Sequence, residues 1–134
     1  TLNLSNCIAL TALPESFGNL KELQTLNLMR CLALTTLPES FGELEKLRAL
    51  YLSHCDALTT LPKSIGNLKQ LGTLDLSDCL SLTSLRFTIS DSNTNIVIMV
   101  LEKIGHQLLE LNLMGSDISN ELLDTIKKMC PKVK

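Results

Sequence analysis

The 134-residue sequence lacks tryptophan, and only 3% of its residues are aromatic. Surfaces on which nucleic-acid bases could stack are therefore scarce. The 12 Lys and Arg residues do not outnumber the 14 Asp and Glu residues, so the charge also gives no reason to expect a nucleic-acid partner. The longest purely apolar run, residues 96–101, has six residues, whereas a membrane helix needs about 20. We therefore expect neither nucleic acid nor membrane as a partner.

Leucine is abundant instead, with 31 copies, and other residues recur at a fixed interval of 24. The aligned unit reads L-x-x-L-x-L-x-x-C-x-x-L-x-x-L-P-x-x-F/I-G-x-L-x-x and is complete in residues 23–46 and 47–70. A fixed period of this length predicts a stack of similar coils. The positions that share the period are Cys7, Cys31, Cys55 and Cys79, then Pro14, Pro38 and Pro62, then Gly18, Gly42 and Gly66.

Each unit begins with alternating leucine and polar residues, as in residues 26–29, which is typical of a short half-buried strand. The following proline prevents the strand from continuing, and we expect the later glycine to permit a tight return. Coils stacked in parallel at roughly 4.8 Å would place each leucine beside its equivalents. The leucines are therefore predicted to form rows inside a solenoid.

This pattern resembles leucine-rich repeats, and its style is similar to that of plant intracellular immune receptors with a nucleotide-binding switch and of plant Ras-group-related repeat proteins. The resemblance implies an α/β fold, namely a right-handed solenoid. It would have a parallel concave β-sheet of about five strands, irregular convex turns, and helices near the C-terminus. We expect a single domain, 1–134, made of repeats at about 1–22, 23–46, 47–70, 71–107 with an inserted helix, and a C-terminal capping repeat at 108–134.

The last third of the sequence departs from the repeat. Leu71 and the next clear repeat start, Leu108, are 37 residues apart, which is 13 more than the period. Apolar residues at spacings of three and four predict an inserted helix of about ten residues ending near Gly105. A second amphipathic helix is expected to end at Cys130-Pro131 and to cap this end. The first coil has no equivalent cap, so we expect the sequence to belong to a longer chain or an assembly.

The regular cysteines allow three interpretations. Neighbouring coils would bring them about 5 Å apart, close enough for disulfides. Buried thiols that weakly bond a loop carbonyl fit the inward position better, and a straight row cannot surround a tetrahedral zinc ion. We therefore expect no metal and no cofactor. Reduced thiols in turn indicate a cytoplasmic, reducing compartment.

The sequence does not indicate catalysis. His54 precedes Cys55, but neighbours at a strand end point in opposite directions, so they are not expected to form a nucleophile and base. The polar side chains that alternate with the leucines would line the concave face. Tyr51, the single tyrosine, is expected to be its exposed centre, because Tyr and Arg are enriched in interface hot spots. The predicted partner-binding residues are Asn27, Met29, Arg30, Arg48, Tyr51, Ser53, His54, Asp75, Ser77, Asp78, Asn112 and Met114.

The leading hypothesis is therefore a non-catalytic module that binds a protein partner, within an intracellular receptor of signalling, innate immunity or plant defence. Two alternatives stay open. The chain could be a structural scaffold or packing segment of a larger assembly. It could also be the substrate-recognition part of a ubiquitin ligase or an effector whose catalytic domain lies elsewhere.

Overall fold

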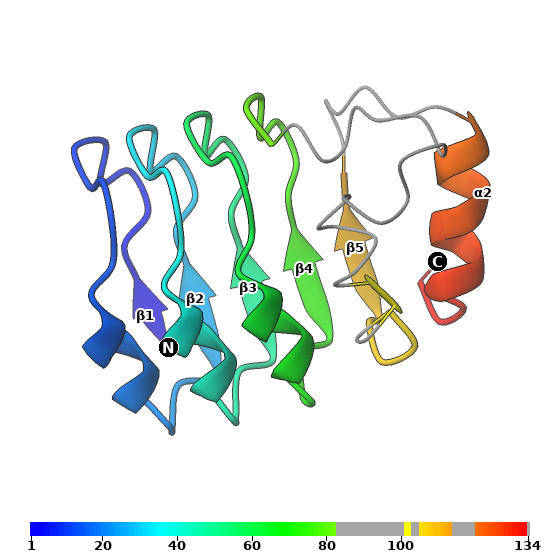
Figure 1. The fold of residues 1–134 in the computed structure, drawn as a ribbon, viewed down its shortest axis with the longest axis horizontal. Helices are drawn as coiled ribbons and strands as arrows, with labels where there is room; N and C mark the ends of the chain where they lie inside the picture. The colour runs from blue at the N-terminus through cyan, green and yellow to red at the C-terminus, as the bar shows by residue number, and fades with distance from the viewer. Residues whose placement is uncertain (83–100, 103–104, 114–119, 134) are drawn as a thin grey trace.

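The computed structural model describes residues 1–82, 101–102, 105–113 and 120–133, and they form a stack of similar coils (Figure 1). Each coil contributes one short strand to a parallel five-stranded sheet with the order β1-β2-β3-β4-β5. The predicted leucine-rich-repeat solenoid with a parallel sheet is thereby confirmed. The strands are β1 Leu2–Asn3, β2 Thr25–Asn27, β3 Ala49–Tyr51, β4 Thr73–Asp75 and β5 Glu110–Asn112.

Leucine determines the register of this sheet. Leu50 in β3 pairs with Leu26 in β2 and with Leu74 in β4, and all three side chains are completely buried. A shift of one residue would turn this row of leucines toward solvent, because successive strand residues point to opposite faces. The 24-residue spacing of the leucines therefore fixes which residues become neighbours on the opposite, polar face of the strands.

On the side opposite the sheet, the first three coils are more regular than the sequence suggested. Where irregular turns were expected, each coil forms five residues of 3-10 helix directly after the repeat proline, whose backbone is extended. The fixed φ of proline suits this extended position before a helix. The three helices are η1 Glu15–Asn19, η2 Glu39–Glu43 and η3 Lys63–Asn67.

The glycines in these helices have a different role from the predicted one. Neither Gly18 nor Gly42 has a positive φ, so neither is needed for a tight return. A Cβ atom on Gly18 would lie 2.5 Å from the carbonyl oxygen of Ser40, and one on Gly42 would lie 2.4 Å from that of Ser64. Glycine is required because each 3-10 helix presses against the backbone of the next one.

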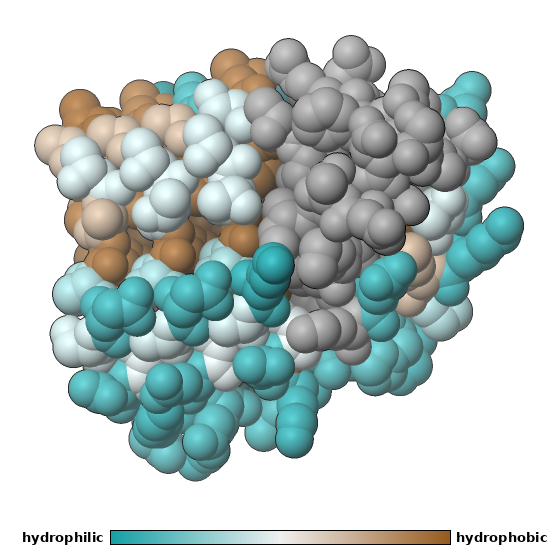
Figure 2. All heavy atoms as spheres, in the orientation of Figure 1, coloured by the Kyte–Doolittle hydropathy of each residue, from teal (hydrophilic) through white to brown (hydrophobic). Residues whose placement is uncertain are grey.

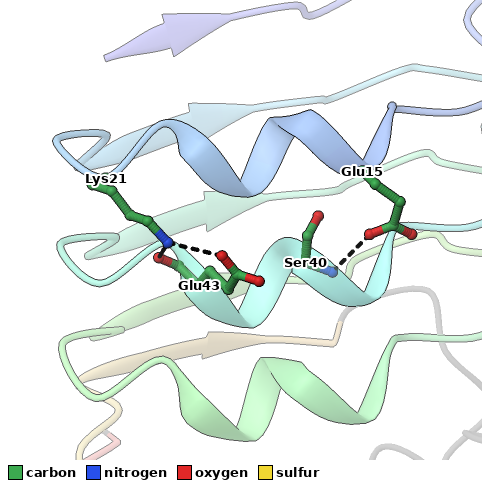
Figure 3. Close-up of polar contacts among 4 residues, drawn as sticks. All are labelled: Glu15, Lys21, Ser40 and Glu43. Carbon is green, nitrogen blue, oxygen red and sulfur yellow. Dashed lines mark hydrogen bonds and ion pairs between the residues drawn. The ribbon is translucent and has the colours of Figure 1, made fainter.

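Polar side chains connect neighbouring 3-10 helices on the outside (Figure 3). Lys21 Nζ lies 2.9 Å from Glu43 Oε2 and also donates to the Glu43 carbonyl at 3.1 Å. The backbone N–H of Ser40 donates to Glu15 Oε2 at 3.1 Å. Figure 2 shows hydrophilic residues gathered over this side, below rows of hydrophobic residues that repeat from coil to coil. Because these contacts lie in solvent, each contributes little to stability.

The core lies between the sheet and the 3-10 helices. Leucine fills most of it, but Phe17 and Phe41 from neighbouring coils stack with their ring centroids 6.0 Å apart. Ile65 holds the equivalent place in the next coil and is fully buried. Two of the three phenylalanines in the sequence therefore fill the same row of the core.

The C-terminal helix is confirmed as α2, Asn120–Met129, and it lies at the far end of the sheet in Figure 1. Cys130 follows it and is buried, and Gly105 packs so closely that a Cβ there would lie 2.5 Å from the Met129 carbonyl oxygen. The Gln107 amide donates to the Leu68 carbonyl, which ties this end to the regular coils. Most of the predicted inserted helix lies outside the described residues.

Candidate partner-binding face

The central row of the strand face follows directly from the register. We call the strand face the surface formed by strand side chains that point away from the leucine core. Its central row contains one residue from each strand, and these residues are paired across the sheet: Asn3, Asn27, Tyr51, Asp75 and Asn112.

Asn27 and Asp75 in this row close the turns that follow β2 and β4. Asn27 Oδ1 accepts a hydrogen bond from the Met29 backbone N–H at 2.9 Å. Asp75 Oδ1 accepts one from the Ser77 backbone N–H at 3.0 Å and another from Ser77 Oγ at 2.7 Å. These are Asx turns, in which the side chain replaces a backbone acceptor. Asn27 and Asp75 therefore have a structural role, which the regular recurrence of Asn and Asp in the sequence could have indicated.

Tyr51 is the exception in the row. A phenol ring has no acceptor placed to close the turn. In that turn, Ser53 Oγ is buried without a hydrogen-bond partner in the described part of the chain. Tyr51 is half-buried, so it is less accessible than the exposed centre that the sequence predicts. The ring shares its register with Asn27 and Asp75. Its presence is not explained by the structural role that those two residues have.

Ser53 and Ser77 do not lie open to a partner. They are 3% and 7% exposed, which contradicts their predicted place on an accessible face. The strands end at Tyr51 and Asp75, so both serines already belong to the turn. Their short side chains are enclosed there, and the Ser77 hydroxyl is directed back to Asp75.

Arg30, His54 and Asp78 also lie beyond the strands. They have φ values of 60°, 56° and 55°, as does Asn6 with 62°, which places all four in the left-handed region. The backbone N–H of Arg30 donates to the Ser53 carbonyl at 2.9 Å, which holds this turn against the next coil. We call these four residues the turn row. His54 Nε2 lies 3.5 Å from Asp78 Oδ2 of the next coil.

The remaining predicted residues occupy different parts of the same side. Met29 is half-buried just after β2, and Arg48 is exposed just before β3. Asn112 is half-buried in β5 beside Asp75, whereas Met114 lies outside the described residues. A second row of the strand face also belongs to the surface: Thr25, Ala49, Thr73 and Glu110.

The cysteine row supports the coils from inside. The thiols of Cys31, Cys55 and Cys79 donate to carbonyls of the preceding coil at 3.3, 3.2 and 3.1 Å. Their burial and their bonds to a carbonyl agree with the prediction. Cys7, in the first described coil, is exposed, contrary to it. Cys130, like these four, is a free thiol.

Burial also makes these thiols poor nucleophiles. It is the main cause that raises the pKa of Cys55 and of Cys79 to about 12, and it raises the pKa of Cys31 as well. A thiol of this kind remains protonated at neutral pH, whereas the thiolate is the reactive form. The cysteine row therefore fits a structural role.

Clusters of metal ligands and membrane-spanning helices are both absent from the described residues. Within them, no group of three or more His, Cys, Asp or Glu side chains is arranged to hold a metal ion. No helix in the same part of the chain combines the length and apolarity needed to cross a membrane.

Parallel strands, leucine rows and one 3-10 helix in each regular coil define a leucine-rich-repeat solenoid. The family model for leucine-rich repeat regions matches residues 1–129, and the chain belongs to this family. Domains of this family are generally protein–protein interaction modules and are typically not enzymes.

A solved structure of a leucine-rich-repeat protein has the same fold. A leucine-rich-repeat protein of Leptospira interrogans is 25% identical, with a TM-score of 0.59 over 92% of this chain and 27% of its own. The leucine-rich repeat domain of the type III effector XopL is 32% identical, with a TM-score of 0.43 over 54% of this chain and 32% of its own. The chain thus spans about a third or less of the length of either protein. No curated protein sequence matches it.

Proposed function

We propose that the strand face, the predicted concave side, binds a protein partner without catalysis and that Tyr51 is the centre of the contact. The observation that carries this proposal is the break in the central row. Asn27 and Asp75 close turns of their own coils, whereas Tyr51 stands in the same register without that role. Tyrosine offers a large rigid surface with one polar end, which suits an interface centre.

The neighbours of Tyr51 agree with this role. Met29 of the preceding coil adds a second partly exposed apolar side chain, and Ala49 in the same strand leaves space beside the ring. Exposed Arg30 and Arg48 flank this spot. An apolar centre surrounded by charged residues is the usual anatomy of a protein interface.

Tyr51→Asn tests the proposal sharply, because it gives β3 the residue that β2 already has at this position. The turn should then gain the Asx bond, and the fold should remain intact. Ligands would first be selected from a displayed random peptide library with the unaltered chain. We expect Tyr51→Asn to lower the affinity for the selected ligands by about tenfold or more, which corresponds to the loss of a moderate hot spot. Lys63→Ala, on the opposite side, is the matched control and should bind normally.

Equal affinity of Tyr51→Asn and the unaltered chain for every selected ligand would refute the strand-face centre. An equal loss of affinity in Tyr51→Asn and Lys63→Ala would indicate a general effect on folding instead. Thermal melting of both variants separates these two results, because only a general effect lowers the melting temperature.

We also propose the finer role suggested by the repeat style, recognition within a cytoplasmic immune or signalling receptor. The four buried thiols and the absence of disulfides among the five cysteines support a reducing compartment. A fluorescent fusion of the native full-length protein should distribute in the cytoplasm. Fluorescence confined to the secretory pathway would contradict this placement.

A second candidate function, packing within an assembly, is favoured by the first coil. Leu20 is 42% exposed there, whereas its equivalents Leu44 and Leu68 are fully buried by neighbouring coils. Leu2 and Leu23 lie beside Leu20 in an open hollow. If this end packs against another subunit, the chain should associate in sedimentation experiments, and Leu20→Glu should abolish the association. A monomer at all concentrations would count against this candidate.

A further inference from the structure

Charge is segregated along the strand side of the solenoid. The basic end consists of Arg30 in the second coil and Arg48 in the third. The acidic end consists of Asp75 and Asp78 in the fourth coil and Glu110 in β5. The net charge of −2 does not reveal this division, because it sums all 12 basic and 14 acidic residues of the chain.

The two guanidinium groups are available for a partner. Both arginines are exposed, and in the part of the chain that the structure describes no ion pair involves either one. On the acidic side, Asp75 closes a turn, Asp78 is close to His54, and Glu110 Oε2 accepts a bond from Thr73 Oγ1 at 3.4 Å. These contacts fix the position of the acidic end next to β4 and β5.

The strand order sets the distance between the ends. Arg30 and Asp78 occupy the same turn position two coils apart, and Arg48, just before β3, is two strands away from Glu110 in β5. At about 4.8 Å per strand, two steps make about 10 Å, and the widest pair, Arg30 and Glu110, is three steps or about 14 Å apart. Both distances exceed the Debye length of about 8 Å at physiological ionic strength, so each end attracts its own counter-charge.

We propose that the partner's contact segment is itself bipolar, with acidic side chains over Arg30 and Arg48 and basic side chains over Asp78 and Glu110. A segment of one charge would be attracted at one end and repelled at the other. A bipolar segment is attracted at both ends, and Tyr51 lies between them. Charge patterns of this kind determine specificity and orientation more than affinity. The inference rests on the proposed strand-face function and adds the chemistry of the partner.

Three synthetic peptides of about five residues test it, since an extended residue spans about 3.3 Å and the two charged ends are then about 13 Å apart. They share an apolar centre and carry Glu at one end and Lys at the other, Glu at both ends, or Lys at both ends. In fluorescence anisotropy at low salt, the bipolar peptide should bind at least about threefold more tightly than either other peptide. The preference should vanish near 1 M salt, where the Debye length is about 3 Å.

A charge-swapped variant provides the control. Arg30→Glu, Arg48→Glu, Asp78→Lys and Glu110→Lys together leave the net charge unchanged. The variant should bind the bipolar peptide in the opposite orientation. A spin label on the acidic end of the peptide should broaden the amide signal of Met29 in the unaltered chain and that of Asn112 in the variant.

Equal affinity for the three peptides, no binding of any of them at low salt, or an orientation unaffected by the swap would overturn the bipolar inference. The strand-face proposal would still stand if library ligands remain sensitive to Tyr51→Asn. The strand-face proposal can also fail by itself. If the bipolar peptide is preferred but changes the NMR chemical shifts of amides only in η1, η2 and η3, the strand face is not the binding site.

Discussion

The close packing of the 3-10 helices makes Gly42→Ala the most informative test of the fold. The added methyl group would lie 2.4 Å from the Ser64 carbonyl oxygen and 2.6 Å from Ser64 Cβ. Neither atom is the flexible end of a long side chain, so η3 would have to move away from η2. The bond from the Ser64 backbone N–H to Glu39 Oε2, already 3.4 Å long, would be stretched further.

The expected magnitude follows from two opposing effects. Overpacking of this kind costs about 1 to 3 kcal/mol. Replacing glycine by alanine also restricts the unfolded chain, which stabilises the fold by about 0.4 to 1 kcal/mol when the site accepts the methyl group. Because the obstacle at Gly42 is a neighbouring backbone, we expect a net loss of about 2 kcal/mol.

Gly72→Ala is the matched control. The nearest atoms to a Cβ at Gly72 are the Arg48 carbonyl oxygen at 3.8 Å and Leu109 Cδ1 at 3.9 Å, and its φ is not positive. The same substitution should therefore be neutral or slightly stabilising there. Urea unfolding followed by circular dichroism would compare the two variants. Equal stability of Gly42→Ala and Gly72→Ala would refute the argument that glycine serves the approach of adjacent coils.

Three further predictions concern the core, the thiols and the strand face. Leu50→Ala should lower the free energy of unfolding by about 2 to 5 kcal/mol in urea titrations, because the side chain is fully buried; a loss below about 1 kcal/mol would contradict this packing. Raising the pH above 9.0, the ordinary thiol pKa, should destabilise the protein up to about pH 12. Unfolded thiols ionise in that range, whereas Cys55 and Cys79 remain protonated in the fold. Replacing both cysteines by Ala should flatten this part of the pH profile, and an unchanged slope would argue against the raised pKa values. Tyr51→Asn should leave the melting temperature unchanged or raise it, since one Asx bond contributes about 0.5 to 1.5 kcal/mol; marked destabilisation would show that the ring is needed by the core.

The repeat carried enough information to predict the architecture. The leucines and cysteines that occupy equivalent positions in successive coils recur every 24 residues. This spacing can be read directly from the sequence. The C-terminal helix was also predictable, because apolar residues at spacings of three and four lead up to Cys130-Pro131. The 3-10 helical form of the convex turns was not predictable, since the pattern of a single coil does not show that three proline–glycine segments will stack as regular helices.

The candidate site was less predictable. The prediction extended the strand face to Ser53, His54 and Asp78, but the strands end after three residues and the backbone then enters the left-handed region. Alternation holds only while the backbone stays extended. It therefore gave the right side for Asn27 and Tyr51, and it failed for the residues of the turn.

The sequence by itself determined that leucine rows would be buried, that parallel coils would stack in the observed order, and that one polar residue of each strand would meet its equivalents. Only the tertiary structure decided where each strand ends, why Gly42 must lack a side chain, and which polar residues already have partners. The physical reason is that the first set depends on periodicity along one chain. The second depends on distances of a few ångströms between neighbouring coils, such as the 2.9 Å bond that engages Asn27 and has no counterpart at Tyr51.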